Sequence, residues 1–302
     1  MPQRAGPETS RTKERPWFHS SIGETLTPTG RELFEKYSKI PPAEVDDHLY
    51  KARDFAWDIF PWPCVGEFWF VHFGLSLHPQ YPALLARLTS PTNPSPPRLL
   101  DLGTCLGQDL RKLVFDGVPA EQLYGSDIFS DFEQAGTMLF RDEEKFAGHF
   151  IAADLLVEDA DDSLGALVKT EETWDVVSAL MFLHIWDYKN QVAACKRILK
   201  LLKPEKGSLL IGASTGSVKP GEEWYKPPLV PQERSIYRHS NETFVQMWNE
   251  IEEDLGIRVK VECTYDDEGE RAARLKEEEG KGKGHFFKGG DQRRLYFSVE
   301  LL

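Results

Sequence analysis

The stretch LLDLGTCLGQDL, residues 99–110, decides the fold. An apolar run over 98–103 predicts a buried strand, and the glycines that follow lead into an expected helix over 107–116. A strand that passes through glycines into a helix brings its backbone close to a ligand at the carboxyl end of the strand. The stretch therefore predicts a ligand-binding turn in an α/β fold.

The spacing of the glycines separates this turn from a dinucleotide-binding loop. Such a loop needs GxGxxG to seat a pyrophosphate over a helix N-terminus. Here Cys105 and Gln108 stand where the second and third glycines belong, and the pattern is instead DxGxxxG, formed by Asp101, Gly103 and Gly107. Taken singly, a glycine pair at such a turn also fits tight backbone packing without a ligand.

Strands and helices alternate further along the chain. The expected strands are 98–103, 123–128, 149–155, 174–183 and 207–214, and the expected helices are 107–116, 130–146 and 190–203. Short connections between them predict a mostly parallel sheet with helices on both faces. The runs 257–265 and 293–302 predict a terminal antiparallel pair, seven strands in all, with a long mobile hairpin loop at 266–292.

The upstream sequence has a different composition. Helical stretches are expected at 30–38, 43–57, 68–77 and 79–88, broken by prolines, and the loop SPTNPSPP at 90–97 contains four prolines. This loop is the predicted domain boundary. The expected organisation is a flexible N-terminal arm at 1–28, a helical lid or substrate cap at 29–97, and a cofactor-binding domain at 98–302.

The charge and the cysteine content exclude several classes of protein. The net charge is −13, with 49 acidic against 36 basic residues, which disfavours a nucleic-acid substrate. No apolar run is long enough to span a bilayer, and the N-terminus does not read as a leader peptide. The four cysteines have no metal-ligand spacing, so no metal is expected. These features favour a cytoplasmic protein without a membrane anchor.

Two acidic residues follow later strands of the predicted sheet. Asp127 ends the second strand, where a carboxylate can accept hydrogen bonds from both ribose hydroxyls of a nucleoside. Asp154 follows the third strand, where it can accept the exocyclic amine of adenine. The alternatives are an N-cap near Ser130 for Asp127 and an ordinary loop position for Asp154. With Asp101, an acidic residue therefore stands at or near the end of each of three strands. Together these residues predict a nucleoside-binding site.

The fourth strand, WDVVSALMFLHIW, ends near His184. A histidine at the edge that carries the acids could act as a general base. It could equally be a packing residue that bonds to backbone.

In this order, the motifs resemble those of class I S-adenosylmethionine (SAM)-dependent methyltransferases. The resemblance covers residues 98–302 and includes WDVV…LHIW (174–186) and LKPEKGSLLI (202–211). It implies a Rossmann-like methyltransferase fold with SAM as cofactor, Gly103 and Gly107 lining its methionine part and Asp101 facing its amino group. Further cofactor residues implied are Cys105, Asp127, Ile128, Asp154 and Leu155. Cys105 departs from the family pattern, which has a glycine there, so altered cofactor affinity is expected.

The segment WDIFPWPCVGEFWF (57–70) resembles the N-terminal lid of fungal secondary-metabolism methyltransferases. That resemblance implies methyl transfer to a carboxylate or hydroxyl oxygen of a polyketide, terpenoid or meroterpenoid. The candidate acceptor pocket comprises Phe60, Trp62, Phe68, Trp69 and Phe182, with His184 or His72 as the base for a hydroxyl acceptor. For any one of these aromatic residues, a core position between lid and sheet is the competing interpretation.

Three rival functions stay open at this point. One is a Rossmann-type oxidoreductase, which the missing GxGxxG disfavours. Another is a SAM-fold protein without methyl transfer, either a SAM-dependent cyclase or a regulatory binding protein. The third is a methyltransferase acting on protein. The expected partner is a small-molecule substrate, with no nucleic acid and no membrane, and a homodimer is an open alternative to a single chain.

Overall fold

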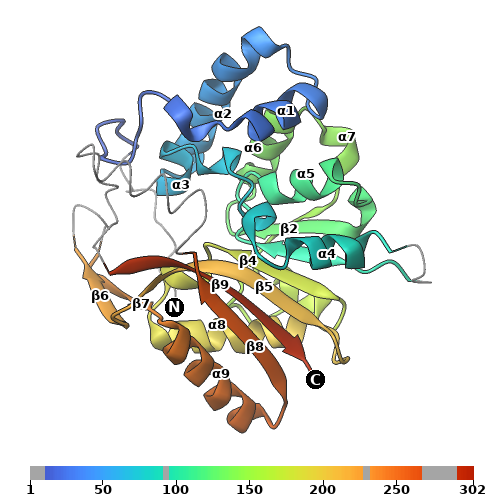
Figure 1. The fold of residues 1–302 in the computed structure, drawn as a ribbon, viewed down its shortest axis with the longest axis vertical. Coiled ribbons are helices and arrows are strands. Elements are labelled where there is room, and N and C mark those ends of the chain that lie inside the picture. The colour runs from blue at the N-terminus through green and yellow to red at the C-terminus, as the bar shows by residue number, and fades with distance from the viewer. Residues whose placement is uncertain (1–10, 91–94, 227–231, 267–290) are drawn as a thin grey trace. The chain divides into compact units, whose positions relative to one another are not determined.

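The computed structural model describes residues 11–90, 95–226, 232–266 and 291–302, and the chain divides into two compact units, 1–170 and 171–302. The expected mobile loop at 266–292 lies almost entirely outside the described residues. Each unit has its own strands and helices, and Figure 1 labels them.

The N-terminal part of the first unit is helical. Its helices are α1 (Pro28–Lys36), α2 (Val45–Ile59), α3 (Pro63–Gly66) and α4 (Tyr81–Leu88). Thr27 caps α1 by accepting a hydrogen bond from the Gly30 backbone N–H, and Pro28 fits the first helical position because it lacks an N–H. Figure 1 shows α1 and α2 beside α6 (Asp131–Phe140), and α2 packs directly against α6.

The expected helix over 68–77 is wrong. In its place are two short 3₁₀ helices, η3 (Trp69–Val71) and η4 (Gly74–Leu77). Phe68 and Phe73, which precede them, have positive φ angles of 59° and 49°. A residue in this left-handed conformation interrupts a right-handed helix, so the aromatic-rich sequence folds as consecutive tight turns.

The expected loose arm at 1–28 packs onto the lid from residue 11 onward. Trp17 is 4% exposed and its indole N–H donates to the Pro61 carbonyl at 3.1 Å. The indole N–H of Trp57 in turn donates to the Arg11 carbonyl at 2.9 Å. Burying an indole ring stabilises the folded state by a few kcal/mol, which outweighs the polar composition of the surrounding sequence. Residues 1–10 lie outside the described part of the chain.

Three parallel strands form the sheet of the first unit, in the order β3-β2-β1. They are β1 (Leu99–Leu102), β2 (Leu123–Asp127) and β3 (Phe150–Ala152), and the helices between them are α5 (Gln108–Phe115), α6 and α7 (Glu143–Phe146). The predicted helix at 130–146 is divided because Arg141 is left-handed, with φ at 54°. In register, Leu102 lies opposite Ser126 and Asp127 opposite Ala152.

The second unit contributes the other four strands of the main sheet, in the order β4-β5-β9-β8. β4 (Val176–Leu180) and β5 (Leu209–Ser217) are parallel, whereas β9 (Gln292–Leu301) is antiparallel to both β5 and β8 (Val259–Tyr265). The prediction of seven strands, mostly parallel with a terminal antiparallel pair, is confirmed.

Helices α8 (Tyr188–Leu201) and α9 (Asn241–Leu255) lie side by side in the second unit (Figure 1). The ring of Phe244 on α9 packs at 4.8 Å against Phe297 of β9, which fixes the helix to the sheet. A separate antiparallel pair, β6 (Gly221–Tyr225) with β7 (Arg234–Arg238), was not expected from the sequence. The remaining short helices are η1 (Gly23–Thr25), η2 (Pro42–Glu44), η5 (Ala120–Gln122), η6 (Ala166–Thr170) and η7 (Leu183–Ile185).

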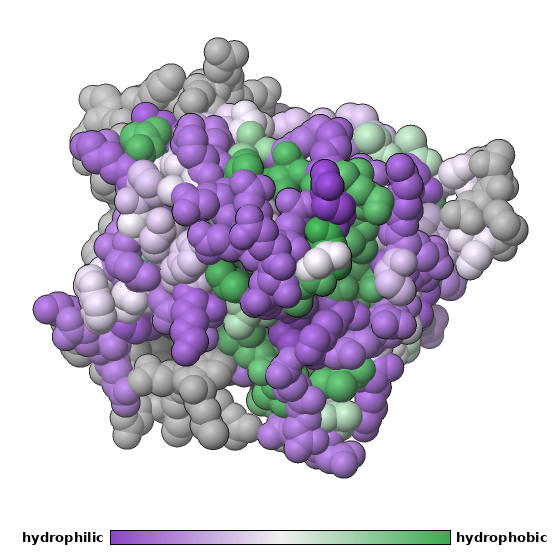
Figure 2. Space-filling view, turned by 90° about the horizontal axis from the view of Figure 1, so that it is seen from below, coloured by the Kyte–Doolittle hydropathy of each residue, from purple (hydrophilic) through white to green (hydrophobic). Residues whose placement is uncertain are grey.

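Hydrophilic side chains predominate on the face shown in Figure 2, with hydrophobic ones scattered between them. Scattered exposed apolar residues are normal on folded proteins. None of the helices in the described residues is long and apolar enough to cross a membrane.

Candidate active site

The turn after β1 has three residues in the left-handed conformation. The φ angles are 65° for Gly103, 49° for Cys105 and 66° for Gly107. Gly107 is also the N-cap residue of α5, and a Cβ placed there would collide with the Arg111 guanidinium. Glycine is therefore required at 107 for both conformation and space, whereas Cys105 adopts a conformation that costs a non-glycine residue about 1–2 kcal/mol.

Backbone hydrogen bonds tie this turn to the end of β2. The Thr104 N–H donates to the Ser126 carbonyl at 3.0 Å, and the Cys105 N–H donates to Oδ2 of Asp127 at 3.1 Å. The other carboxylate oxygen, Oδ1, accepts the Phe129 N–H at 3.1 Å. A carboxylate has about four acceptor positions, so both oxygens of Asp127 keep capacity for ligand hydroxyls.

The electrostatics of Asp127 reflect its burial. Desolvation raises its pKa to about 6, while backbone hydrogen bonds from Phe129, Cys105 and Ile128 act in the opposite direction. The carboxylate is therefore ionised above about pH 6, and an added donor such as a ribose hydroxyl would favour the charged form further.

Asp154 lies two residues past the end of β3. The Ala153 N–H donates to the Asp127 carbonyl at 3.0 Å, which joins the ends of β2 and β3. Oδ1 of Asp154 accepts the Leu156 N–H at 3.0 Å, so this residue also shapes its own loop. Leu155 is buried, and Asp101 is buried within β1 at 3% exposure, opposite Gly125.

Aromatic residues of the lid reach the same strand end. The Phe60 ring stacks on Phe129 with centroids 5.0 Å apart, and Trp62 lies 4.2 Å from Phe60 and 6.5 Å from Phe129. Phe129 was not identified from the sequence, where only its position two residues after Asp127 could have pointed to it. These three rings cover the segment that holds the Asp127 carboxylate.

Phe68 does not belong to this group. Its side chain is fully buried inside the lid, 5.5 Å from the Tyr50 ring and under the Arg53 guanidinium at 4.6 Å. The prediction of Phe68 as an acceptor-pocket residue is therefore corrected to a core position. Trp69 and His72 are half-buried at the two ends of η3.

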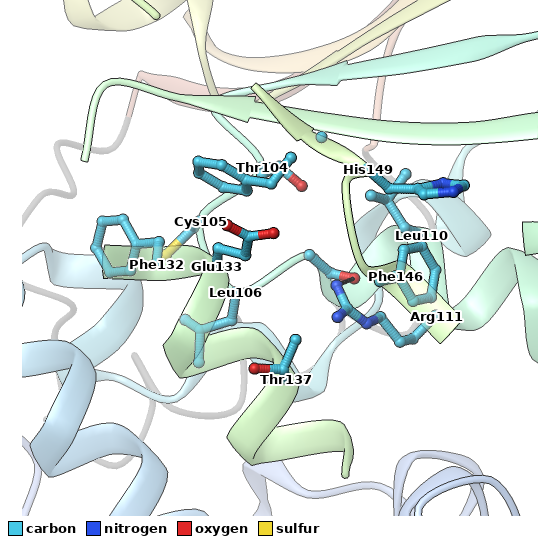
Figure 3. Close-up of a pocket in the computed structure, with 13 residues that line it drawn as sticks. Thr104, Cys105, Leu106, Leu110, Arg111, Phe132, Glu133, Thr137, Phe146 and His149 are labelled. Carbon is cyan, nitrogen blue, oxygen red and sulfur yellow. Dashed lines mark hydrogen bonds between the residues drawn. The ribbon is translucent and has the colours of Figure 1, made fainter. Parts of the chain in front are cut away.

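Figure 3 shows a pocket behind the turn rather than at the acids. Its lining includes Thr104, Cys105 and Leu106 of the turn, Phe132, Glu133 and Thr137 of α6, and Arg111, Phe146 and His149. Neither Asp127 nor Asp154 lines it. Its volume of about 20 Å³ is enough for roughly one water molecule. The pocket is too small for a nucleoside.

A buried ion pair supports the turn from this side. Nε and Nη2 of Arg111 donate to the two Asp142 carboxylate oxygens, both at 3.0 Å, and the side chains are 7% and 5% exposed. The Tyr37 hydroxyl of the lid donates to the same carboxylate at 2.5 Å. Since a Cβ at Gly107 would meet the Arg111 guanidinium, this network fixes the space available to the turn.

In the second unit, His184 lies in η7 rather than at the end of a strand. Met181, with φ at 53°, ends β4 and starts the turn. The Trp186 carbonyl anchors the turn by accepting bonds from the Tyr237 N–H and from Nε2 of Gln191, both at 2.9 Å. The Phe182 ring lies 4.9 Å from Trp186.

His184 is an uncharged imidazole near cationic groups. Burial lowers its pKa well below the usual range, and the charges of Arg238, Arg294 and Arg234 lower it further. Its Nδ1 is buried and has no hydrogen-bond partner among the residues that the structure describes. A buried ring nitrogen without a partner costs free energy unless a ligand satisfies it.

Comparison with known proteins identifies the family. A family model described as the meroterpenoid methyltransferase N-terminal domain matches residues 17–71. The O-methyltransferase atr3 of Stereocaulon alpinum is 38% identical over 95% of this chain and 76% of its own length. The asnovolin E/chermesin D methyltransferase of Aspergillus novofumigatus is 33% identical over 77% of this chain and 79% of its own length. The chain belongs to this family of fungal SAM-dependent methyltransferases.

Solved structures resemble the methyltransferase more distantly. A magnesium protoporphyrin IX methyltransferase from Synechocystis PCC 6803 with bound SAM has a TM-score of 0.42 and 14% identity, over 89% of this chain and 94% of that chain.

The residues at the strand ends fit the cofactor of the methyltransferase family. Gly103 and Gly107 are left-handed and have no side chain at the turn, and the Asp127 carboxylate retains acceptor positions for two hydroxyls. Cys105, the departure from the family pattern, still donates its backbone N–H to Asp127.

Proposed function

We propose that the chain transfers the methyl group of SAM to an oxygen of a small secondary metabolite, a carboxylate or an acidic hydroxyl. The observation that supports this proposal most directly is a pair of hydrogen bonds. The backbone N–H groups of Cys105 and Phe129 hold the Asp127 carboxylate beside the glycine turn. Two relatives support the oxygen acceptor, since they are named O-methyltransferases. The description of the matching N-terminal family and the name of the Aspergillus relative support a meroterpenoid-like scaffold.

The cofactor-holding roles follow from the strand ends. Asp127 would accept the ribose hydroxyls, Asp154 and Leu155 would border the adenine, and Gly103 and Gly107 would face the methionine part. Asp101 would face the amino group through a bridging water from its buried position in β1. SAM supplies a methyl group on a sulfonium sulfur, which is already a good leaving group, so the chain's task is alignment of the acceptor.

The charge around His184 favours an acceptor that arrives as an anion. Three arginines depress its pKa, so their positive field reaches the imidazole. The same field would attract a carboxylate and lower the pKa of a phenol. Because His184 is uncharged at neutral pH, it can accept a proton from a hydroxyl acceptor, while a carboxylate acceptor needs no base.

Aromatic residues near Asp127 would exclude water from the reaction. Phe60, Trp62 and Phe129 form a contiguous hydrophobic group next to the cofactor acid. Transfer from a cationic donor to an anionic acceptor removes opposite charges, and such a reaction is faster where water does not stabilise those charges.

A labelled-methyl assay tests this function. The purified chain is incubated with methyl-labelled SAM and a panel of aromatic polyketide acids, the corresponding methyl esters and phenols. We expect the label in the acids as base-labile methyl esters, or in the phenols as stable methyl ethers. Label recovered only on carbon or nitrogen would contradict the proposal. So would a chain that binds SAM but yields no labelled product with an extract of fungal metabolites.

A further inference from the structure

The end of helix α2 leaves backbone carbonyls that the helix itself does not satisfy. The helix ends at Ile59 because Phe60 is extended, with φ at −154° and ψ at 129°, a conformation that a residue before a proline favours. Carbonyls in the last turn of a helix have no partner within it. In addition, α2 has no basic residue in its last turn to offset the negative end of its dipole. The hydrogen-bond donors and the positive charge therefore have to come from elsewhere.

Arg11 supplies both from a distant part of the chain. Its Nε donates to the Asp58 carbonyl, and its Nη2 donates to the Ile59 carbonyl at 3.1 Å. A planar guanidinium can reach two neighbouring acceptors at once and keeps its charge at any physiological pH. The backbone carbonyl of Arg11 in turn accepts the indole N–H of Trp57, a fully buried residue of α2, at 2.9 Å. Arg11 is thus a cationic cap on the carboxyl end of α2.

Trp17 satisfies the next carbonyl that lacks a helical partner. Its indole N–H donates to the Pro61 carbonyl at 3.1 Å, and the residue is 4% exposed. The Trp17 carbonyl would lie 2.3 Å from a Cβ at Gly66, so glycine at 66 permits this close approach. The His19 N–H also donates to the Gly66 carbonyl at 3.1 Å. Segment 11–22 therefore contacts the end of α2 and the end of α3.

The other carbonyls of the same stretch are satisfied locally. The Phe60 carbonyl accepts the Trp62 N–H at 2.8 Å, and the Trp62 carbonyl accepts the N–H groups of Val65 and Gly66, both at 3.1 Å. Each backbone carbonyl over 58–62 therefore accepts a hydrogen bond, and those at 58, 59 and 61 accept it from side chains of segment 11–22. The backbone that carries two aromatic rings of the lid is thus held from that segment.

We propose that Arg11 and Trp17 are positioning residues for methyl transfer, which hold the rings of Phe60 and Trp62 against Phe129. The inference rests on the proposed function, in which these rings exclude water from the reaction. Phe60 stacks on Phe129 with ring centroids 5.0 Å apart, and the Phe129 N–H donates to the carboxylate that would hold the ribose. Removal of the Arg11 guanidinium leaves the end of α2 without its cap, so the two rings lose a fixed backbone while the cofactor residues keep their contacts.

Lys13 provides the matched control within the same segment. Its Nζ pairs with the Asp54 carboxylate at 2.9 Å, and the two side chains are 56% and 41% exposed. It therefore joins segment 11–22 to α2 through a side chain, without contact to the carbonyls over 58–62. An exposed ion pair of this kind contributes little to stability.

Hydrogen–deuterium exchange with mass spectrometry tests the positioning in the full-length chain. We expect amides over 58–62 to exchange at least threefold faster in Arg11→Ala, with no change in β1 or β2, and Lys13→Ala to match the parent. Trp17→Phe keeps an aromatic ring and removes the indole donor, so it should also accelerate exchange over 58–62. Circular dichroism establishes that each variant is folded, and Arg11→Ala, at an exposed residue, tests the proposal by itself if Trp17→Phe is not.

Kinetics separate a positioning role from a loss of cofactor binding. We expect kcat for methyl transfer to fall at least fivefold in Arg11→Ala, because the rings shield the reaction less well. The KM for SAM should change less than twofold, since the contacts of Asp127 and the glycine turn are untouched. Lys13→Ala should retain the parental kcat and KM.

Unchanged exchange over 58–62 in Arg11→Ala or Trp17→Phe would overturn the positioning role of the residue replaced. Faster exchange with a parental kcat would overturn the connection to methyl transfer. Equal losses in Arg11→Ala and Lys13→Ala would overturn the assignment to the guanidinium, because any tether of the segment would then suffice. Failure of the proposed function is distinguishable, since the parent itself then yields no methylated product while the exchange experiment still reports on the contacts.

Discussion

Cys105 is a non-glycine residue in a left-handed backbone conformation at the cofactor turn. A glycine at this position would adopt that conformation at little cost, whereas a side chain is strained there. The strain is retained because the backbone N–H of Cys105 donates to the Asp127 carboxylate.

A pair of variants at Cys105 measures this strain. Cys105→Gly and Cys105→Ala both remove the thiol, so their comparison isolates the backbone. We expect the glycine variant to unfold with a free energy about 1 kcal/mol higher than the alanine variant, the reverse of the usual order at ordinary positions. Chemical denaturation measures both, and equal stabilities would show that the turn is not strained.

The raised pKa of Asp127 predicts a pH dependence of stability. The folded pKa is about 6, above the ordinary value of 3.8, so the folded chain binds a proton more tightly than the unfolded chain. The associated stability is fully present below about pH 4 and is lost as pH rises through about 6, amounting to at most about 3 kcal/mol. Urea denaturation of the cofactor-free chain across this range measures the loss.

Asp127→Asn is the matched control for that measurement. It preserves the shape of the side chain and cannot titrate, so the part of the slope between pH 4 and 7 that belongs to Asp127 should disappear. If the variant kept the full slope of the parent, another group would be responsible for it.

At the scale of elements, the network of Tyr37, Arg111 and Asp142 connects three helical segments. Tyr37 ends α1, Arg111 belongs to α5, and Asp142 precedes α7. The Arg111 guanidinium also covers the Phe146 ring at 4.0 Å. A lid helix is thereby joined to the helix that follows the cofactor turn.

Asp142→Ala tests the importance of this network. Removal of one partner leaves the buried Arg111 charge uncompensated, which we expect to cost about 3–5 kcal/mol of unfolding free energy. Lys36→Ala, at the exposed pair with Glu32 on α1, should cost no more than about 0.5 kcal/mol. Denaturation of both variants provides the comparison, and similar small losses would mean that the Asp142 pair contributes little.

Sequence periodicity predicted the elements that depend on local pattern. The strands around 99, 123 and 209 and the helix α8 all follow from apolar runs or from 3/4 spacing. Helix α9 had such a signal as well, because Ser240 forms a capping box with Thr243 and the buried residues Phe244, Met247, Trp248 and Ile251 share one face. It was overlooked.

Other elements depend on contacts that periodicity does not contain. The turns at Phe68 and Arg141 require positive φ angles from residues that rarely adopt them, so tertiary packing decides them. The packed N-terminal segment depends on Trp17, a single large side chain in a polar stretch. Within the site, the sequence located Asp127 and the glycine turn, but the stacking of Phe60 on Phe129 required distant segments to meet.

At the scale of the whole molecule, the lid and the cofactor-binding strands belong to one methyltransferase chain with a net charge of −13. The family match at 17–71 includes the lid residues Phe60 and Trp62, which contact Phe129 near the cofactor acid. The N-terminal segment that this family model matches therefore packs on the end of β2, and its role in shielding the reaction from water is part of the proposed function.

Trp62→Ala tests this role. Loss of the indole opens the hydrophobic group beside Asp127, so we expect turnover to fall about tenfold, equivalent to about 1.4 kcal/mol, with little change in cofactor affinity. Trp224→Ala, at an indole that is 64% exposed on β6, serves as the control and should match the parent. Equal turnover in the two variants would exclude Trp62 from the reaction site.

The most direct test of the account is calorimetric titration of S-adenosylhomocysteine into the parent and Asp127→Ala. The parent should bind, and loss of the acceptor for both ribose hydroxyls should weaken binding at least tenfold, about 1.4 kcal/mol or more. Circular dichroism of both proteins checks that they share a fold. Two results would contradict the assignment of these strand ends as the cofactor site. One is undiminished affinity in Asp127→Ala, and the other is no binding by the folded parent.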